Sequence, residues 1–324
     1  MSDPKTRIMG IGVLLCLAVM LIFFIIVTVG REKDKASVNS AMAPDIQVRS
    51  HDQSVSPNTE LPDLADLPDL ADTITRIFRE TEIQNTDRTA FIEDFWQWIF
   101  GEAGIPEYLA RKVAASALES PTFIMELLML LQEDPFTFYL VDKQNPLPRG
   151  YEPDDLVSLV PGSYRVTRDG LMLREKARDA LEEMANAAAG DGIVLTIGSA
   201  YRSAEYQAQV YEREVRASGQ EAADRVSARP GMSQHQLGLT VDFSPISDEF
   251  AKTPASRWLL SNAGSFGWSL SYPEGYEPVT GYSWESWHFR YVGRPLASFI
   301  DNYFDGIQQY ALQFIHAWQK EAGE

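Results

Sequence analysis

Hydrophobic and polar positions divide the chain into stretches of different character. The first is a run without a charged residue from Ile8 to Gly30. This run exceeds the roughly 20 residues that a membrane-spanning helix needs, so it predicts a transmembrane anchor. A cleavable signal peptide is the alternative, because Ala41-Met42-Ala43 resembles a cleavage site. The apolar run is too long for a signal peptide, however, and the site lies well beyond it, which favours an uncleaved anchor.

Residues 31–72 lack periodic apolar positions and are rich in Ser, Pro and Asp. This composition predicts a disordered acidic linker. The linker ends in a tandem repeat in which Leu61-Pro-Asp-Leu-Ala-Asp66 is followed by Leu67-Pro-Asp-Leu-Ala-Asp72. Two copies are too few for a solenoid, and proline breaks helices, so a spacer is the favoured interpretation. A docking motif is the alternative.

From about Thr73 to Glu133, apolar residues recur at helical spacings, as in the set Phe91, Ile92, Phe95, Trp96 and Ile99. The pattern predicts a small helical subdomain over residues 73–140, with two or three helices. Its aromatic residues are expected to pack in a core. A groove that docks an unknown protein partner is the alternative.

Residues 141–324 combine helical and strand patterns. Helices are expected at Leu171–Ala189 and from about Leu296 to Lys320, and short strands at Ile193–Ile197 and Trp287–Val292. The two kinds of element do not alternate as βαβ units, so the pattern predicts the α+β class, with a small antiparallel sheet surrounded by helices.

Charge and cysteine content narrow the chemistry. The formal net charge of -18 repels phosphate backbones, which argues against nucleic-acid binding. The one cysteine, Cys16, lies in the apolar run, so the remainder of the chain can form neither a disulfide nor a thiolate metal site. A metal ion would have to be held by carboxylates and by the histidines His51, His235, His288 and His316.

Two segments contain the parts of a catalytic zinc site. His235 and Asp242 are seven residues apart with Gly238 between them, and Glu285 precedes His288 by three residues. Two imidazoles and a carboxylate can bind Zn²⁺ and leave a fourth position for water, beside a second carboxylate that acts as a base. On a regular strand Glu285 and His288 would point to opposite faces, so this interpretation requires a turn or bulge between them.

Four ordered motifs within about residues 141–293 resemble the D-alanyl-D-alanine carboxypeptidase family that includes VanY-type enzymes. The motifs are Asn145-Pro-Leu-Pro148 with Pro153-Asp-Asp-Leu156, Ser199-Ala-Tyr-Arg202-Ser203 with Gln207, Pro230-Gly-Met-Ser233-Gln-His235-Gln-Leu-Gly-Leu-Thr-Val-Asp242, and Glu285-Ser-Trp-His288-Phe-Arg-Tyr291. Fold relatives of that family are the lysostaphin-like peptidases and the hedgehog signalling domain. The resemblance implies a zinc peptidase domain over residues 141–324 that includes the C-terminal helix.

The resemblance also implies individual roles. His235, Asp242 and His288 would be zinc ligands, and Glu285 the catalytic base. Arg202 would be a cation near the substrate carbonyl or carboxylate, where a planar donor fork suits an oxyanion. The further substrate contacts that it suggests are Gln207, Ser233, Tyr201 and Trp287, and Trp284 is a candidate for the mouth of the site.

Packing is the favoured role for Tyr291, since large aromatic residues mostly contribute buried area. The same role is favoured for Trp287, which is also a candidate substrate contact. His316 is expected to be a packed or surface histidine, and His51, in the linker, has no neighbours with which to bind metal. Met232 and Thr240 depart from the aromatic and small residues expected of the family at these positions, which bears on the shape of the pocket.

Rival mechanisms find little support. The one Ser-x-x-Lys match, Ser2-Asp-Pro-Lys5, precedes the membrane span, which argues against a serine peptidase, and His-Glu-x-x-His is absent from the sequence. A zinc-containing module that only binds peptide or protein is the non-enzyme alternative, but it would have no use for Glu285.

The expected activity is D-Ala-D-Ala carboxypeptidase, with L,D-carboxypeptidase and peptidoglycan endopeptidase as alternatives. Each of these substrates is a peptidoglycan stem peptide, which favours a single-pass cell-membrane protein with its catalytic domain outside the cytoplasm. The charges beside the apolar run do not decide its orientation.

Overall fold

The structure is a computed structural model that describes residues 85–130 and 133–323. The predicted transmembrane span Ile8–Gly30, the linker 31–72 and the start of the predicted helical subdomain lie outside the described residues. Within the described ranges, none of the helices combines the length and the apolar character that crossing a bilayer requires.

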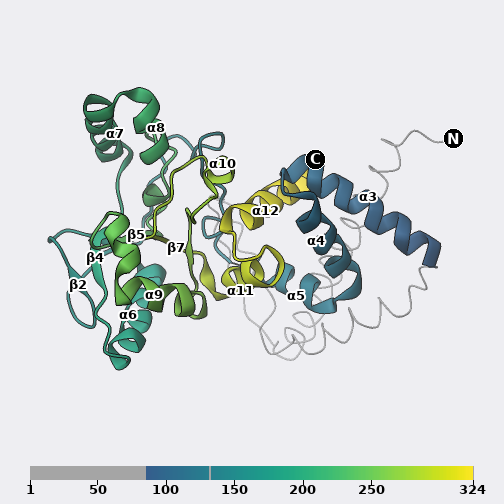
Figure 1. Cartoon of the computed structure of the whole chain (residues 1–324), viewed down its shortest axis with the longest axis horizontal. Coiled ribbons are helices and arrows are strands. Elements are labelled where there is room, and N and C mark those ends of the chain that lie inside the picture. The colour runs from purple at the N-terminus through teal and green to yellow at the C-terminus, as the bar shows by residue number, and fades with distance from the viewer. Residues whose placement is uncertain (1–84, 131–132, 324) are drawn as a thin grey trace, which may run out of the picture.

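Three helices form the N-terminal part of the described chain: α3 (Asn85–Ala103), α4 (Glu107–Glu119) and α5 (Pro121–Leu130). Their apolar residues recur at helical spacing and are buried together with residues of the last two helices in one hydrophobic core. The ring of Phe123, from α5, lies 5.2 Å from that of Phe299 and 6.3 Å from that of Phe314. The two ends of the described chain therefore form one helical unit, on the right in Figure 1.

The predicted closing helix is two helices, α11 (Gly293–Tyr303) and α12 (Gln308–Gly323). Between them, Asp305 and Gly306 have positive φ angles of 53° and 75°. This left-handed backbone cannot continue an α-helix, and Asp and Gly are among the residues that adopt it most readily. The break turns the chain so that both helices pack against α3, α4 and α5.

Short strands make up a five-stranded sheet with the order β2-β4-β5-β7-β6. Its strands are β2 (Arg165–Val166), β4 (Thr196–Ser199), β5 (Thr240–Phe243), β6 (Trp268–Leu270) and β7 (His288–Tyr291). Neighbouring strands are antiparallel except β2 and β4, which run parallel. The α+β class is confirmed, but the main sheet is mixed and not wholly antiparallel.

The predicted helix Leu171–Ala189 begins later than expected. Residues Met172–Arg174 form strand β3, which pairs with β1 (Leu156–Ser158) in a separate antiparallel ribbon. Helix α6 follows at Glu175–Gly190. The predicted strand Ile193–Ile197 is likewise displaced toward the C-terminus, to β4, whereas β7 agrees within one residue at each end with the strand expected at Trp287–Val292.

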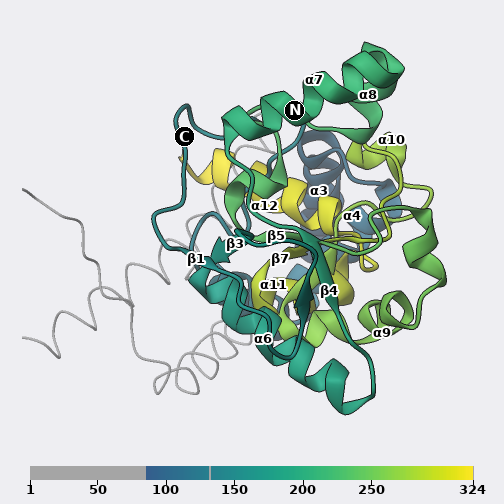
Figure 2. The ribbon, with the colours of Figure 1, turned by 90° about the vertical axis from the view of Figure 1, so that its left-hand side faces the viewer.

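Helices lie on both sides of the sheet (Figure 2). Helix α6 and helix α9 (Pro254–Asn262) share a hydrophobic core with strands β4, β5 and β7. Helix α7 (Ala204–Ser218) and helix α8 (Gln220–Val226) lie beyond the opposite side. The remaining short helices are η2 (Gln234–Leu237), η3 (Asp248–Lys252), η4 (Ala263–Phe266) and α10 (Glu277–Thr280).

The boundary at residue 141 that the sequence suggests remains a proposal. The C-terminal helices that it assigns to the peptidase domain bury their apolar faces in the core of the helical unit. A chain cut at that boundary would expose these faces, because α11 and α12 share one hydrophobic core with α3, α4 and α5.

Gly267 provides a test of how tightly the chain packs against the start of α11. Its φ is 80°, and an added Cβ would lie 2.8 Å from backbone atoms of Gly293 and Arg294. Gly192, with a φ of 76°, would have no atom within 4 Å of an added Cβ. We expect Gly192→Ala to cost about 1–2 kcal/mol through left-handed strain alone, and Gly267→Ala to cost about 1–3 kcal/mol more through overpacking. Urea denaturation of both variants measures the difference, and equal losses would contradict this account.

Candidate functional site

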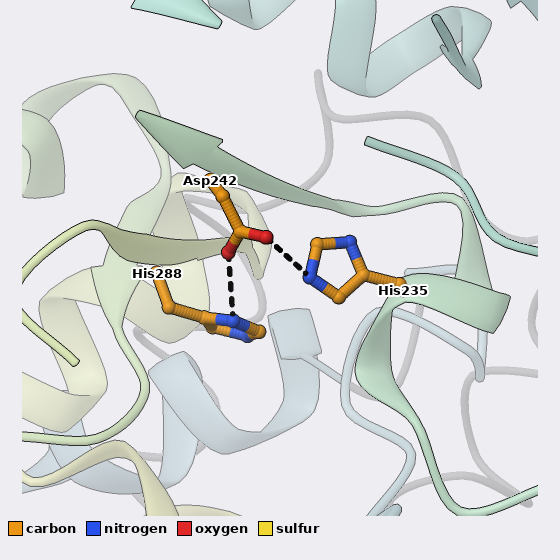
Figure 3. Close-up of side chains that lie close together, drawn as sticks. All are labelled: His235, Asp242 and His288. Carbon is orange, nitrogen blue, oxygen red and sulfur yellow. Dashed lines mark ion pairs between the residues drawn. The ribbon is translucent and has the colours of Figure 1, made fainter. Parts of the chain in front are cut away.

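Three side chains converge at the centre of the sheet. His235 comes from η2, Asp242 from β5, and His288 from the first position of β7. His235 Nε2 lies 3.1 Å from Asp242 Oδ2, and His288 Nδ1 lies 3.1 Å from Asp242 Oδ1 (Figure 3). One ligand atom from each residue lies within 4.8 Å of the other two, and all three residues are buried.

Local structure explains this convergence. Ser233 caps η2 by accepting a hydrogen bond from the backbone N–H of His235, and Gly238 ends it with a φ of 69°. This left-handed residue turns the chain into β5, where Asp242 pairs directly with His288 of β7. Paired residues of antiparallel strands project to the same face, so register brings the carboxylate to the imidazole.

His235 is held in one tautomer. Its Nδ1 lies 2.6 Å from the carbonyl oxygen of Ala200, which can only accept, so Nδ1 carries the proton. Burial, assisted by the charge of Arg202, lowers the pKa of His235 to about 4, so the imidazole is neutral near pH 7. The lone pair on Nε2 therefore faces a carboxylate.

The buried space between these groups fits a cation. His235 Nε2 and Asp242 Oδ1 are buried and make no hydrogen bond with the described residues. His235 Nε2 faces Asp242 Oδ2 at 3.1 Å, and two acceptors that face each other without a proton are unfavourable, whereas a bound cation would satisfy both. Two imidazoles and one carboxylate are a ligand set of catalytic zinc, so the residues present fit Zn²⁺.

His288 and Asp242 are electrostatically linked. Burial alone lowers the pKa of His288, but its contacts with the carboxylates of Asp242 and Glu285 outweigh burial and raise the pKa to about 9. Burial raises the pKa of Asp242, yet the two imidazoles hold it well below its usual range. Asp242 is therefore an ionised carboxylate between the two imidazoles.

Glu285 reaches the same group from a turn. Ser286 and Trp287 form the turn, and the backbone N–H of His288 donates to the Glu285 carbonyl at 3.3 Å. This geometry removes the opposite-face problem of a regular strand. Glu285 Oε2 lies 3.2 Å from His288 Nδ1 but makes no ion pair with His235 in the described structure. Burial raises the pKa of Glu285, which suits a group that accepts and returns a proton.

A cavity of about 740 Å³ opens onto these residues. Arg202 lines it with Nη2 at 3.7 Å from Asp242 Oδ2. Its Nε is buried without a hydrogen-bond partner among the described residues. The guanidinium thus stands beside the three-residue group with donor capacity left for a ligand.

The predicted substrate contacts divide into two groups. Gln207, Ser233, Trp287 and Trp284 line the cavity. Gln207 Nε2 donates to the carbonyl of Ala228 at 2.7 Å, while its buried Oε1 has no partner among the described residues. Tyr201 is not among the lining residues, and its hydroxyl donates to Glu152 at 3.4 Å, so the structure does not place it at the cavity.

Among the described residues, Tyr291 and His316 are not part of the metal group. Tyr291 is 6% exposed and belongs to the core. His316 is exposed on α12, which agrees with its expected role as a surface or packed residue. His51 lies outside the described residues.

Sequence reasoning missed the residues that hold the two imidazoles. These are the Ala200 carbonyl at His235, Gln234 Oε1 at 3.1 Å from His288 Nε2, and Tyr272, whose ring centroid lies 4.6 Å from that of His288. Gln234 is adjacent to His235 within the third motif, which was a signal that could have found it. Ala200 stands in the motif Ser199-Ala-Tyr-Arg202-Ser203, but nothing in that motif indicates the role of its backbone carbonyl, and Tyr272 stands in none of the four motifs.

A buried His-Asp-His group, a neighbouring glutamate and an arginine at an open cavity are the parts that the site of a metal-dependent hydrolase needs. Comparison with known proteins identifies the family. The D-alanyl-D-alanine carboxypeptidase family VanY matches residues 170–294. YodJ, an inferred carboxypeptidase of Bacillus subtilis, is 36% identical over 178 residues, which cover 53% of this chain and 65% of that protein.

Two solved structures are also similar. The LdcB LD-carboxypeptidase is 36% identical, and the match covers 52% of this chain and 85% of that one with a TM-score of 0.47. A vancomycin-resistance D,D-pentapeptidase VanY in complex with Zn(II) is 32% identical, with 54% and 98% covered and a TM-score of 0.46. The chain belongs to the VanY-type D-alanyl-D-alanine carboxypeptidase family.

Proposed function

We propose that this protein is a zinc-dependent carboxypeptidase that removes the C-terminal D-Ala from peptidoglycan stem peptides. The observation that carries the proposal is the buried contact between two acceptors, His235 Nε2 and the Asp242 carboxylate, which face each other at 3.1 Å beside His288. Membership of the family supports the substrate class.

Each residue of the site has a distinct part in this proposal. His235, Asp242 and His288 would hold Zn²⁺, which when bound supplies a Lewis acid that activates water and polarises the scissile carbonyl. Glu285, whose pKa is raised by burial, takes a proton from the attacking water and returns it to the leaving amine. Arg202 stabilises the negative charge that develops on the carbonyl oxygen.

The proposal also includes the location of the reaction. Stem peptides lie outside the cytoplasmic membrane, so the apolar run Ile8–Gly30 would anchor the chain with residues 85–323 on the outer side. Attaching a reporter enzyme that is active on one side only to each end of the chain would test this orientation. A C-terminal reporter that is active in the cytoplasm would contradict it.

One experiment can measure whether hydrolysis depends on metal and which peptide bond is cleaved. The full chain is incubated with pentapeptide, tetrapeptide and cross-linked muropeptides, with and without a chelator, and the products are identified by mass spectrometry. We expect loss of one alanine from the pentapeptide, abolished by the chelator and restored by Zn²⁺, because the donor set matches zinc.

The other outcomes separate the alternatives. Trimming of the tetrapeptide would indicate an L,D-carboxypeptidase, and cleavage of cross-links an endopeptidase. No metal-dependent loss of mass from any stem would contradict the peptidase proposal, and Zn²⁺ binding without hydrolysis would favour a binding module.

A further inference from the structure

Helix α12 begins at Gln308, whose side chain reaches from the helical unit to the metal group. Gln308 is 1% exposed. Its Oε1 accepts a hydrogen bond from Gln234 Nε2 at 3.4 Å, and its Nε2 donates to the backbone carbonyl of Ser269 at 3.3 Å. Gln234 Oε1 lies 3.1 Å from Nε2 of His288. One side chain therefore separates Gln308 from His288.

The backbone carbonyl of Ser269 sets the direction of the hydrogen bonds from Gln308 through Gln234 to His288. A carbonyl oxygen only accepts hydrogen bonds, so Gln308 must turn its amide nitrogen toward Ser269 and its amide oxygen toward Gln234. Gln234 must then present its nitrogen to Gln308, which leaves its oxygen for His288. Ser271 supports this orientation, because its hydroxyl donates to Gln234 Oε1 at 2.7 Å.

The orientation of the Gln234 amide decides which nitrogen of His288 carries a proton. An oxygen facing Nε2 requires the proton to be on Nε2, which leaves the lone pair of a neutral imidazole on Nδ1. Nδ1 is the atom that lies 3.1 Å from Asp242 Oδ1. If the Gln234 amide were turned round, an N–H group would face Nε2 and favour the proton on Nδ1, where it would block a metal ion.

We propose that Gln308 is a positioning residue for the metal centre. Through Gln234, it selects the tautomer of His288 whose Nδ1 lone pair is directed at the ion. Residues that hydrogen-bond to metal ligands commonly orient them in this way. The inference rests on the proposed role of His288 as a ligand, but it does not depend on which peptide bond is cut.

This role makes the helical unit part of the site. Gln308 lies beyond residue 294, where the family match ends. Its helix buries apolar residues in one core with α3, α4 and α5. The next residue, Gln309, donates to Asp142 Oδ2 at 3.0 Å and fastens the same turn to another loop. The start of α12 is therefore fixed by contacts on two sides. Gln308 in turn fixes the amide of Gln234, which contacts His288.

The test compares Gln308→Met with Gln309→Met in the full chain. Both residues are buried and adjacent, but the side chain of Gln309 donates to Asp142 and makes no hydrogen bond to Gln234 in the described structure. Affinity for Zn²⁺ is measured by competition with a chromophoric chelator. We expect Gln308→Met to weaken binding about 10–100-fold, the usual loss for a hydrogen-bond partner of a metal ligand, and Gln309→Met to change it less than threefold.

A rescue variant distinguishes positioning from packing. Adding Gln234→Glu to Gln308→Met gives His288 an acceptor whichever way the side chain turns, so we expect most of the affinity to return. Unchanged affinity in Gln308→Met, equal losses in both single variants, or no rescue would overturn the proposal.

A measurement on the unmutated protein keeps the test valid if the variants do not fold. In the ¹⁵N NMR spectrum of the Zn²⁺-loaded chain, His288 should carry its proton on Nε2, and a proton on Nδ1 would overturn the proposal. Failure of the unmutated chain to bind Zn²⁺ at all would instead contradict the proposed function.

Discussion

Replacing Glu285 with glutamine is expected to lower kcat by about 10²–10⁴-fold while Zn²⁺ still binds. Glutamine keeps the shape of the side chain but cannot accept and return the proton of the attacking water. Metal binding should persist, because Glu285 lies 3.2 Å from His288 Nδ1 but is not one of the three residues whose ligand atoms meet. Steady-state kinetics and metal content of the same preparation measure both quantities.

Glu277→Gln is the matched control for this experiment. Glu277 also lines the cavity, but it is paired with Arg225 and makes no ion pair with the metal group in the described structure. We expect its substitution to change kcat less than threefold. A Glu285→Gln protein with full zinc content and full activity would show that another group takes the proton.

The site could be predicted from the sequence because its residues lie in two short segments. His235 and Asp242 are seven residues apart, and Glu285 and His288 are three apart. What the pattern could not show was how Glu285 escapes the alternation of a strand. Ser286 and Trp287 form a turn without glycine or proline, the usual signals, and β7 begins only at His288.

Residues that support the site were harder to predict, since each is far from its partner in the chain. Gln234, Ser271 and Gln308 come from three separate segments of the chain, and only the folded chain brings their hydrogen bonds together. Polar residues of this kind show no periodicity, and an isolated glutamine is more often a surface residue. Tertiary contacts alone distinguish them.

The errors in element boundaries have similar physical causes. Leu171–Arg174 continue the apolar pattern of α6, but pairing with β1 makes part of this segment strand β3. The closing helix breaks at Asp305 and Gly306, a pair typical of turns, which the strong apolar periodicity on either side obscured. In the first case, strand pairing overrode the helical pattern of the sequence. In the second, the apolar periodicity of the flanking residues concealed the turn signal.

Substitution of Arg202 should have the second large effect on catalysis. Arg202→Ala is expected to lower kcat by about 10²–10³-fold, the usual loss when one donor to a developing oxyanion is removed. The effect should fall on kcat more than on KM, because Nη2 lies 3.7 Å from Asp242 and therefore beside the place where the scissile carbonyl would react. Zinc content should remain that of the unmutated protein, since arginine does not bind the metal.

Arg202→Lys separates charge from shape at this position. Lysine keeps the positive charge but loses the planar fork of donors, so we expect it to recover only part of the activity. Arg225→Ala, at an exposed arginine of the same cavity that is paired with Glu277, should leave kcat within threefold. If Arg202→Ala instead raised KM and left kcat unchanged, the guanidinium would bind the terminal carboxylate of the substrate in the ground state, because only a contact that strengthens in the transition state changes kcat.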